Sequence, residues 1–394
     1  MRALANHSPT ESKLDIATHL ALLGFVGALQ VSIAAAGILL TVTLGLWVTG
    51  LITTRERPTA PPFFLALLAY AGATLVSVAF SLDWRVSLVD AREVVLFLVV
   101  PLVYRLARGQ RADTVASVIV TVGGVMAVIG VVQYGILEYD NLGRRPMGTM
   151  GHYMTYSGLL VLALSLAGAR VLFDRKHRVW SALVMPALLV ALIATQTRSY
   201  MVGAGAAIGL LCVLKDMRLL AVGPVLLALV LALAPPQITA RIYSTFDMQD
   251  PTVRDRFAMG RTGVRIMQDH AWTGVGPDMV QEVYPAYRDA EAVEAVNPHL
   301  HNVPIQIGAE RGLPALVIWI SFVVWAIRDL IPRLKEPSTR PLAAAGLAAM
   351  VAMLTGGAFE YNFGDSEFLM LLLVLLTLPH AAGFRTPHPD DAHA

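Results

Sequence analysis

Long apolar runs alternate with short polar connections over most of the chain, and this pattern predicts an all-α, polytopic membrane protein. A helix needs about 20 apolar residues to cross the hydrocarbon core of a bilayer. We expect about twelve transmembrane helices, with the first two joined almost directly at Gln30. The segments are 14–29, 31–53, 61–81, 93–107, 113–135, 154–172, 180–196, 199–214, 217–234, 314–332, 339–357 and 366–383.

One long polar connection divides this series of helices into three regions. Residues 1–234 are expected to hold transmembrane helices one to nine, and residues 314–394 helices ten to twelve with a short cytoplasmic tail. Residues 235–313 form the loop between them, in which 251–268 and 276–289 have a helical pattern. Loops of this length are usually functional, so we expect part of the active site here.

The composition supports a membrane location. Hydrophobic residues make up 56% of the chain and charged residues 15%, with a mean hydropathy of +0.62. Soluble domains carry about 25% charged residues. The single cysteine, Cys212, excludes a disulfide framework and any zinc site built from cysteines. No nucleotide-binding loop is present, which argues against an ATP-driven pump.

The basic residues predict the orientation in the membrane. If the N-terminus is cytoplasmic, the cytoplasmic side carries 18 of the 30 basic residues, including all four lysines. Such an excess is what the positive-inside rule describes. Both chain ends are then expected in the cytoplasm, and residues 235–313 on the outer face.

The outer face carries arginine without lysine, which indicates phosphate recognition. A guanidinium group matches phosphate oxygens in a bidentate way and stays charged when partly desolvated. The alternative is pairing with nearby carboxylates, and both interpretations stay open for any single arginine. The arginines concerned are Arg85, Arg92, Arg144, Arg145, Arg198, Arg241, Arg254, Arg256, Arg261, Arg265, Arg288 and Arg311.

Arg198 and Arg145 occupy two notable positions in this group. Arg198 lies in a polar hinge between two apolar segments, where a charge is costly unless it faces a cavity or a partner. A structural salt bridge is the alternative. Arg145 belongs to a glycine-rich basic loop, residues 143–149, which either folds over a diphosphate or is a simple turn.

A segment rich in histidine and glycine precedes the tenth predicted helix. Residues 297–314 are expected to form a short helix that Gly312 ends and Pro314 restarts. His301 and Asn302 open this helix. A histidine with a near-neutral pKa can take a proton from a hydroxyl group, although a lone histidine is more often structural.

Three carboxylates lie together in the connection between the last two helices. Asp365 and Glu367 form a pair that suits a divalent cation, but two carboxylates without a further ligand are weak support for a metal site. Together with Glu360, they are alternatively expected to orient arginines or an acceptor hydroxyl.

Three motifs along the outer face resemble those of the bacterial O-antigen ligase family, which shares a superfamily with O-antigen polymerases and protein O-oligosaccharyltransferases. They are Thr195-x-Thr197-Arg198-Ser199, then Arg256 with residues 266–277 (Ile-Met-Gln-Asp-His-Ala-Trp-Thr-Gly-Val-Gly-Pro), and His301-Asn302 with Glu310-Arg-Gly312. With the helix layout and the long loop, the resemblance covers nearly the whole chain. Ala271 replaces a proline that is usual in the family, and Gly260 replaces an aromatic residue.

The resemblance implies a glycosyltransferase-C-like architecture and a metal-independent, inverting transfer of a glycan at the periplasmic face of the bacterial inner membrane. The donor would be O-antigen polysaccharide on undecaprenyl diphosphate. The acceptor would be a sugar hydroxyl of the lipid A–core oligosaccharide, as in lipopolysaccharide biosynthesis. Membrane lipids are the other expected partners, whereas no cofactor and no nucleic acid are expected.

The same resemblance suggests roles for the residues already described. Arg198 and His301 would be catalytic, with no metal ligands. The diphosphate would be bound by Arg198, Arg256, Arg261, Arg265 and Arg145. The residues that contact or orient the acceptor would be Asn302, Glu310, Glu360 and Asp365.

Three other functions remain open. An O-antigen polymerase would use the same donor with a lipid-linked repeat as acceptor, and a protein O-oligosaccharyltransferase would use a serine or threonine hydroxyl. A transporter of lipid-linked sugars belongs to a different class. It should carry polar residues through its helices from both faces, whereas here they collect on one face, which favours an enzyme.

Overall fold

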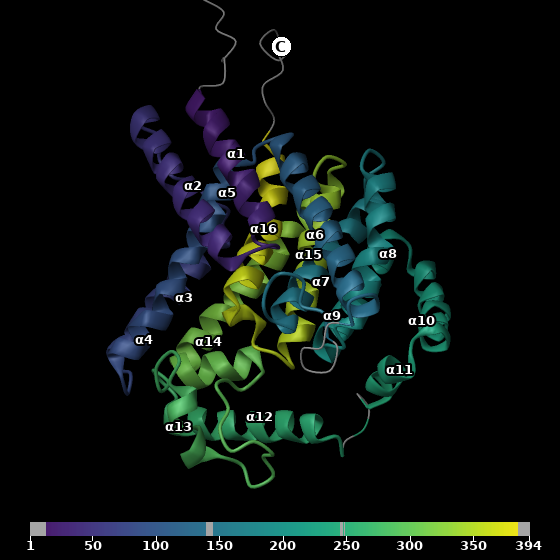
Figure 1. Ribbon diagram of the computed structural model, residues 1–394. Coiled ribbons are helices and arrows are strands. Elements are labelled where there is room, and N and C mark those ends of the chain that lie inside the picture. Colours follow the sequence, from purple (N-terminus) through teal and green to yellow (C-terminus); the bar gives the residue numbers. More distant parts are fainter. Residues whose placement is uncertain (1–12, 139–144, 245–246, 248, 385–394) are drawn as a thin grey trace, which may run out of the picture.

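The computed structural model is a bundle of helices with further helices laid across one end (Figure 1). It describes residues 13–138, 145–244, 247 and 249–384, which contain no β-strand. The first described helix begins at the end of the bundle opposite α12 and α13 (Figure 1). We call the end that carries α12 and α13 the loop end.

Eleven helices of the described part of the chain form the bundle, and the remaining elements connect them or cover one end. The bundle helices are α1 (Lys13–Ala28), α2 (Ile33–Thr54), α3 (Phe64–Ala79), α5 (Val99–Leu106), α6 (Arg111–Gly135), α7 (Tyr153–Phe173), α8 (Arg178–Ala194), α9 (Arg198–Lys215), α14 (Val303–Leu330), α15 (Arg340–Gly357) and α16 (Ser366–Ala382). The other elements are α4 (Trp84–Ala91), α10 (Val222–Leu233), α11 (Pro236–Tyr243), α12 (Pro251–Asp269), α13 (Val280–Tyr287) and the 3₁₀ turns η1 (Arg92–Leu98), η2 (Met217–Ala221), η4 (Pro332–Lys335) and η5 (Asn362–Gly364).

The expectation of a polytopic membrane protein is confirmed in outline. Six stretches among the described residues are long and apolar enough to cross a membrane: α2, α6, α7, α9, α14 continued through η4, and α15. Shorter apolar helices, α3, α8 and α16, accompany them. Each of the twelve predicted segments coincides with helical structure, but the number of spans stays a prediction.

The centre of the bundle is formed by α7, α15 and α16. In the most apolar stretches of α7 and α15, 83% and 78% of the residues are buried, against 22% in α2 at the edge of the bundle. Small residues allow the close approach. A Cβ atom on Gly203 of α9 would lie 3.1 Å from the carbonyl oxygen of Ala352 on α15. Small residues at such contacts are typical of helices that pack within a membrane.

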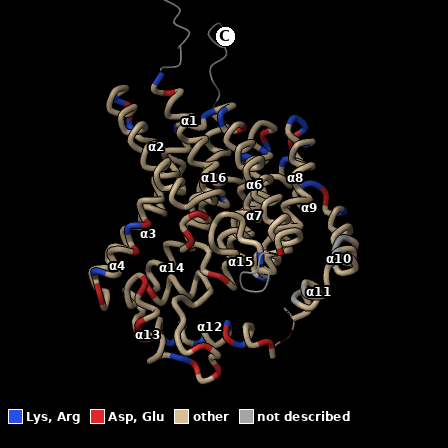
Figure 2. The backbone as a smooth tube through the Cα atoms, in the orientation of Figure 1, with Lys and Arg blue, Asp and Glu red and all other residues tan. Residues whose placement is uncertain are grey.

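Charged residues gather toward the two ends of the bundle, and its middle is largely uncharged (Figure 2). Arg170, in the last turn of α7, is a charged residue that is nevertheless buried, with 1% of its surface exposed. Its guanidinium donates to the hydroxyl of Ser117 at 3.0 Å and to the carbonyl of Asp113 at 2.9 Å. These partners on α6 compensate the burial of the charge.

A kink in α14 organises the loop end. Gly312 has φ 80° and ψ 168°, so the helix from Val303 ends there and a second helix begins at Pro314, as predicted. The amide nitrogens of Val275 and Gly276 donate to the carbonyls of Ala309 and Glu310, at 3.0 and 2.9 Å. These two hydrogen bonds hold the segment before α13 against the kinked part of α14.

The helices of the long loop differ partly from expectation. The helix predicted over 251–268 is confirmed as α12. The helix predicted over 276–289 starts only at Val280, because Gly276 and Asp278 have left-handed φ values of 108° and 60°. The predicted region boundary after residue 313 falls inside α14, and α4 and α11 were not predicted.

Replacing Gly312 with alanine is expected to destabilise the protein strongly. The new Cβ would lie 2.4 Å from the carbonyl oxygen of Trp272, and the left-handed backbone alone would cost about 1–3 kcal/mol. The control is Gly205→Ala on α9, where no atom lies within 4 Å of the added Cβ. Thermal unfolding in detergent should show a lower Tm for Gly312→Ala only. Equal Tm values for the two variants would contradict the role of the kink.

Candidate functional site

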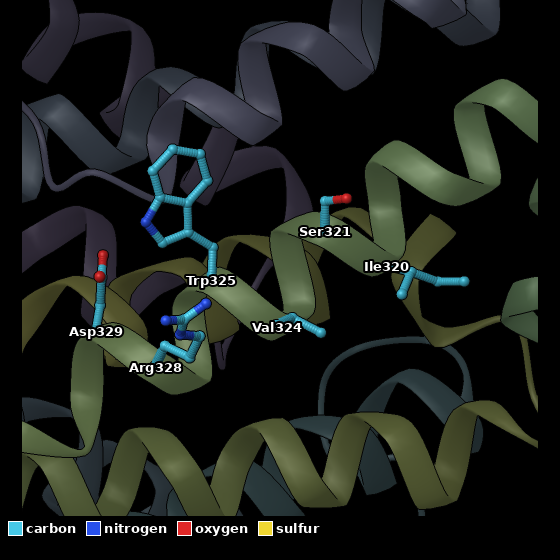
Figure 3. Close-up of a pocket in the computed structure, with 6 residues that line it drawn as sticks. All are labelled: Ile320, Ser321, Val324, Trp325, Arg328 and Asp329. Atoms are coloured by element: carbon cyan, nitrogen blue, oxygen red, sulfur yellow. The ribbon is translucent and has the colours of Figure 1, made fainter.

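Two hollows among the described residues are large enough for a ligand, and they differ in chemistry. The first, of about 710 Å³, lies on the outer face of α14, within a predicted membrane span. Only residues of α14 line it: Ile320, Ser321, Val324, Trp325, Arg328 and Asp329 (Figure 3). Since polar groups from other elements do not converge on it, it does not have the character of a catalytic site.

The second hollow, which we call the polar cavity, lies at the loop end and has a volume of about 470 Å³. Side chains from α4, α7, α9, α14 and the η5 region meet there with residues of the loop. The lining residues are Asp90, His152, Met154, Thr155, Tyr200, Asp278, Pro298, His299, His301, Gln306, Glu310, Glu360, Tyr361, Asn362, Gly364 and Asp365. Convergent polar groups of this kind are typical of an active site.

His301 and Glu360 form a hydrogen-bonded pair in this cavity. Nδ1 of His301 lies 2.9 Å from Oε1 of Glu360, and the ring of His299 lies 4.2 Å from that of His301, centroid to centroid. Nε2 of His299 is 3.5 Å from the same carboxylate oxygen. Because Glu360 accepts the Nδ1 proton, Nε2 of His301 is left as a proton acceptor. His301 has a left-handed φ of 49°, which is uncommon for residues other than glycine.

Arg256 approaches Glu360 from α12, on the other side of the carboxylate. Its Nη2 lies 3.6 Å from Oε2 of Glu360, and its side chain is 20% exposed. Burial lowers the pKa of Arg256, the carboxylates of Glu360 and Asp255 raise it, and the charge of Arg198 lowers it further. Arg256 is therefore a partly desolvated cation at the edge of the polar cavity.

Arg198 is the first residue of α9, directly after the predicted hinge. The hinge is confirmed, since α8 ends at Ala194 and Gln196 has a φ of 53°. The guanidinium donates to the backbone carbonyl and hydroxyl of Ser244, at 2.9 and 3.2 Å, and to Oδ1 of Asp250 at 3.1 Å. In this structure a carboxylate thus contacts the group that we expected to bind phosphate.

Asp250 joins Arg198 to the beginning of α12. Its Oδ1 also accepts from the amides of Thr252 and Val253, at 2.9 and 3.2 Å, and so caps the helix that carries Arg256. Burial opposes ionisation of Asp250, but the hydrogen bond and charge of Arg198 outweigh it and lower the pKa of this carboxyl group. The sequence gives no local signal for this contact.

Arg145 is linked to the polar cavity by its contact with Tyr153. Its guanidinium stands 4.8 Å from the centre of the Tyr153 ring, and that ring is stacked on His152, a residue of the cavity wall. Its neighbours Gly143 and Arg144 lie outside the described residues. Of the basic loop, Arg145 therefore belongs to the surroundings of the cavity.

Arg261 and Arg265 are not brought to the polar cavity. They share one face of α12, as their spacing predicted, but both pair with Asp289, at 2.8 and 3.0 Å. The hydrogen bond from Arg261 lowers the pKa of Asp289 to about 2. This pairing holds the chain after α13 against α12. Sequence spacing could not distinguish these two arginines from Arg256, because the carboxylates that pair with them lie far away in the sequence.

Asn302 and Glu310 support the segment that presents His301. The side-chain oxygen of Asn302 caps α14 at the amide of Ile305, 3.0 Å away, and its amide nitrogen donates to the carbonyl of Ala358. Glu310 is 3% exposed and accepts from Gln306 at 2.7 Å and from the amide of Asp278 at 3.0 Å. Glu310 lines the cavity, whereas Asn302 is not among its lining residues.

Asp365 and Glu367 do not converge as a cation site would require. Asp365 accepts from the hydroxyl of Thr155 at 2.5 Å and caps α16, whereas Glu367 accepts from Ser366 at 2.9 Å. Among the described residues, a ligand set of three groups exists instead at His299, His301 and Glu360, whose ligand atoms lie within 4.8 Å of one another. This set was not expected from the sequence, although His299 and His301 stand two residues apart.

A comparison with protein families agrees with the motifs. Residues 182–320 match a family model described as O-antigen ligase. The match extends from α8 to the second half of α14 and includes Arg198, Arg256 and His301. No curated protein matches the chain.

The matched family consists of glycosyltransferase-like enzymes whose substrates are lipid-linked polysaccharides. The matched segment carries all three motifs on which the resemblance was based, so the resemblance is confirmed. Residues 182–320 are therefore similar to the O-antigen ligase family, and this similarity supports a place in the O-antigen ligase superfamily.

Proposed function

We propose that this protein is an O-antigen ligase of the bacterial inner membrane. It transfers O-antigen polysaccharide from undecaprenyl diphosphate to a sugar hydroxyl of the lipid A–core oligosaccharide, in lipopolysaccharide biosynthesis. The observation that carries this proposal is the chain of contacts from His301 through Glu360 to Arg256. It sets a proton acceptor and a desolvated cation side by side at one cavity.

The arginines serve the donor in this proposal. Cleavage of a glycosyl diphosphate leaves negative charge on the diphosphate, which fixed guanidinium groups stabilise without a metal. Arg198 and Arg256 provide this charge, with Arg145 nearby. Asp250 occupies one face of Arg198 as an internal carboxylate, and the diphosphate replaces it when the donor binds. Arg261 and Arg265 take a structural role at Asp289.

His301 serves the acceptor. A lone pair of the acceptor hydroxyl attacks the anomeric carbon from the side opposite the diphosphate. The bond from that carbon to the diphosphate oxygen breaks, and the diphosphate leaves with the bonding electrons. The hydroxyl proton passes to Nε2 of His301. Glu360 holds the imidazole by Nδ1 and stabilises the imidazolium that forms. The configuration at the anomeric carbon is inverted.

The position of the site suits two lipid-linked substrates. We propose that the loop end faces the periplasm and that both chain ends lie in the cytoplasm, because of the excess of basic residues at the opposite end of the bundle (Figure 2). Both substrates then reach the cavity sideways from the outer leaflet. An O-antigen polymerase and a protein O-oligosaccharyltransferase would use the same donor side and differ in the acceptor.

Deletion of the gene distinguishes ligase from polymerase. Loss of a ligase leaves rough lipopolysaccharide on gels while polymerised lipid-linked chains accumulate. Loss of a polymerase leaves the core bearing a single repeat. We expect the first pattern, and the second would assign the protein to the polymerases.

Arg198→Lys and Arg256→Lys are expected to lower the transfer rate by about 10- to 100-fold and to raise the KM for the donor. Lysine keeps the charge but loses the planar fork that donates two hydrogen bonds. The matched control is Arg265→Lys, on the same helix as Arg256 but paired with Asp289. Initial rates on purified donor and acceptor provide the measurement. A control as impaired as Arg256→Lys would remove the distinction drawn between these arginines.

His301→Gln is expected to reduce turnover by roughly 10²-fold or more while donor binding stays nearly intact. Glutamine still forms hydrogen bonds but has no useful basicity. His270→Gln, whose ring contacts Tyr287 away from the cavity, is the control. Single-turnover rates and donor binding should be measured at matched protein levels. Near-normal turnover of His301→Gln would show that this histidine is not the base.

A further inference from the structure

The lining of the polar cavity is acidic, although the proposed donor is an anion. Arginine and lysine are absent from the lining, whereas five carboxylate residues are present: Asp90, Asp278, Glu310, Glu360 and Asp365. The arginines assigned to the diphosphate flank the cavity instead. Arg311 pairs from behind the lining with Asp90 and Glu310, and Arg256 pairs with Glu360. Asp278 and Asp365 have no arginine or lysine partner among the described residues, so the interior of the cavity suits a different part of the substrates better than a diphosphate.

Asp90 and Asp278 form the most accessible part of this acidic lining. Oδ2 of Asp90 accepts from Arg311 at 2.9 Å, and the side chain remains 30% exposed. The carboxylate of Asp278 forms no hydrogen bond or ion pair within the described part of the chain, but its backbone amide donates to Glu310 at 3.0 Å. That bond and the left-handed φ of 60° fix the residue at the cavity wall.

A second observation points to a ligand in the same cavity. Glu360 is only 6% exposed, yet its Oε2 accepts no hydrogen bond, and its nearest cationic neighbour is Arg256 at 3.6 Å. A buried carboxylate oxygen without a hydrogen bond is unfavourable. Oε2 itself faces Arg256, but Glu360 lines the cavity and its Oε1 lies 2.9 Å from Nδ1 of His301, so a ligand at this wall would lie next to the carboxylate.

We propose that the carboxylate-lined interior is the acceptor subsite, and that it takes a neutral or amino-bearing sugar and excludes an acidic one. Ionised carboxylates only accept hydrogen bonds, which suits the several hydroxyl donors of a sugar ring. An acidic sugar would place a like charge beside Asp278 and Asp90. The volume of about 470 Å³ falls within the range of about 300–1,000 Å³ of small-molecule sites. This inference rests on the proposed function, in which His301 activates the acceptor.

Two acceptors that differ in one group test the subsite. The first ends in a neutral hexose, and the second is the same oligosaccharide with the terminal C6 oxidised to a carboxylate. Wild-type enzyme should prefer the neutral acceptor by at least about tenfold in kcat/KM. Asp278→Asn should narrow this ratio by raising kcat/KM for the acidic acceptor, with the donor KM unchanged. Asparagine tolerates the left-handed backbone and keeps the amide donor to Glu310. The control is Glu282→Gln, because Glu282 is close enough to influence Asp278 but does not line the cavity.

The contrary results are distinct from a failure of the proposed function. Equal use of the two acceptors by wild-type enzyme would overturn the subsite, as would an unchanged ratio in Asp278→Asn. If the protein transfers to neither acceptor, the proposed function fails, but the subsite is still decided by binding. Calorimetry with the methyl glycosides of glucose and glucuronic acid should then show binding of the neutral sugar only, and binding of both alike would overturn it.

Discussion

The carboxylate of Glu360 is the interaction on which the candidate site depends. It is almost buried, and three basic side chains approach it: His301 at 2.9 Å, His299 at 3.5 Å and Arg256 at 3.6 Å. These residues come from the segment before α14 and from α12, so one carboxylate holds the long loop against the bundle. A buried carboxylate is stable only with such partners, and each partner is in turn fixed in position. The proposed base and the proposed donor-binding arginine are therefore positioned by the same group.

The kink at Gly312 explains why two motifs far apart in the chain belong together. The Thr-Gly-Val-Gly-Pro stretch at 273–277 packs beside the kink, and its backbone amides at Val275 and Gly276 donate to the carbonyls of Ala309 and Glu310. A Cβ atom on Gly274 would lie 2.2 Å from the carbonyl oxygen of Glu310. At Gly274 and Gly312 the backbones therefore approach too closely to leave room for a side chain. The function of the two glycines is to dock the loop, and this docking brings Asp278 and Glu310 to the cavity wall.

Signals within short stretches of sequence predicted much of the fold, but few of the ion pairs and hydrogen bonds around the candidate site. The hinge at Arg198, the helix over 251–268 and the break at Gly312 follow from apolar periodicity and from glycine and proline positions, which act within a few residues. The choice of Arg256 over Arg261 and Arg265 depends on Glu360 and Asp289, which lie elsewhere in the chain. The contact between Arg198 and Asp250 is of the same kind. The early end of the helix predicted over 276–289 arises from backbone angles at Gly276 and Asp278 that periodicity does not reveal.

Our central chemical proposal is that arginine and histidine side chains at the loop end catalyse an inverting transfer without a metal. The most direct measurement reconstitutes the purified protein with a defined polyprenyl-diphosphate-linked donor and a defined acceptor, in excess chelator. The anomeric configuration of the new linkage is then determined by NMR. We expect undiminished transfer, with inversion of the anomeric configuration relative to the donor. A retained configuration, or activity that disappears with chelator and returns with magnesium or manganese, would contradict it.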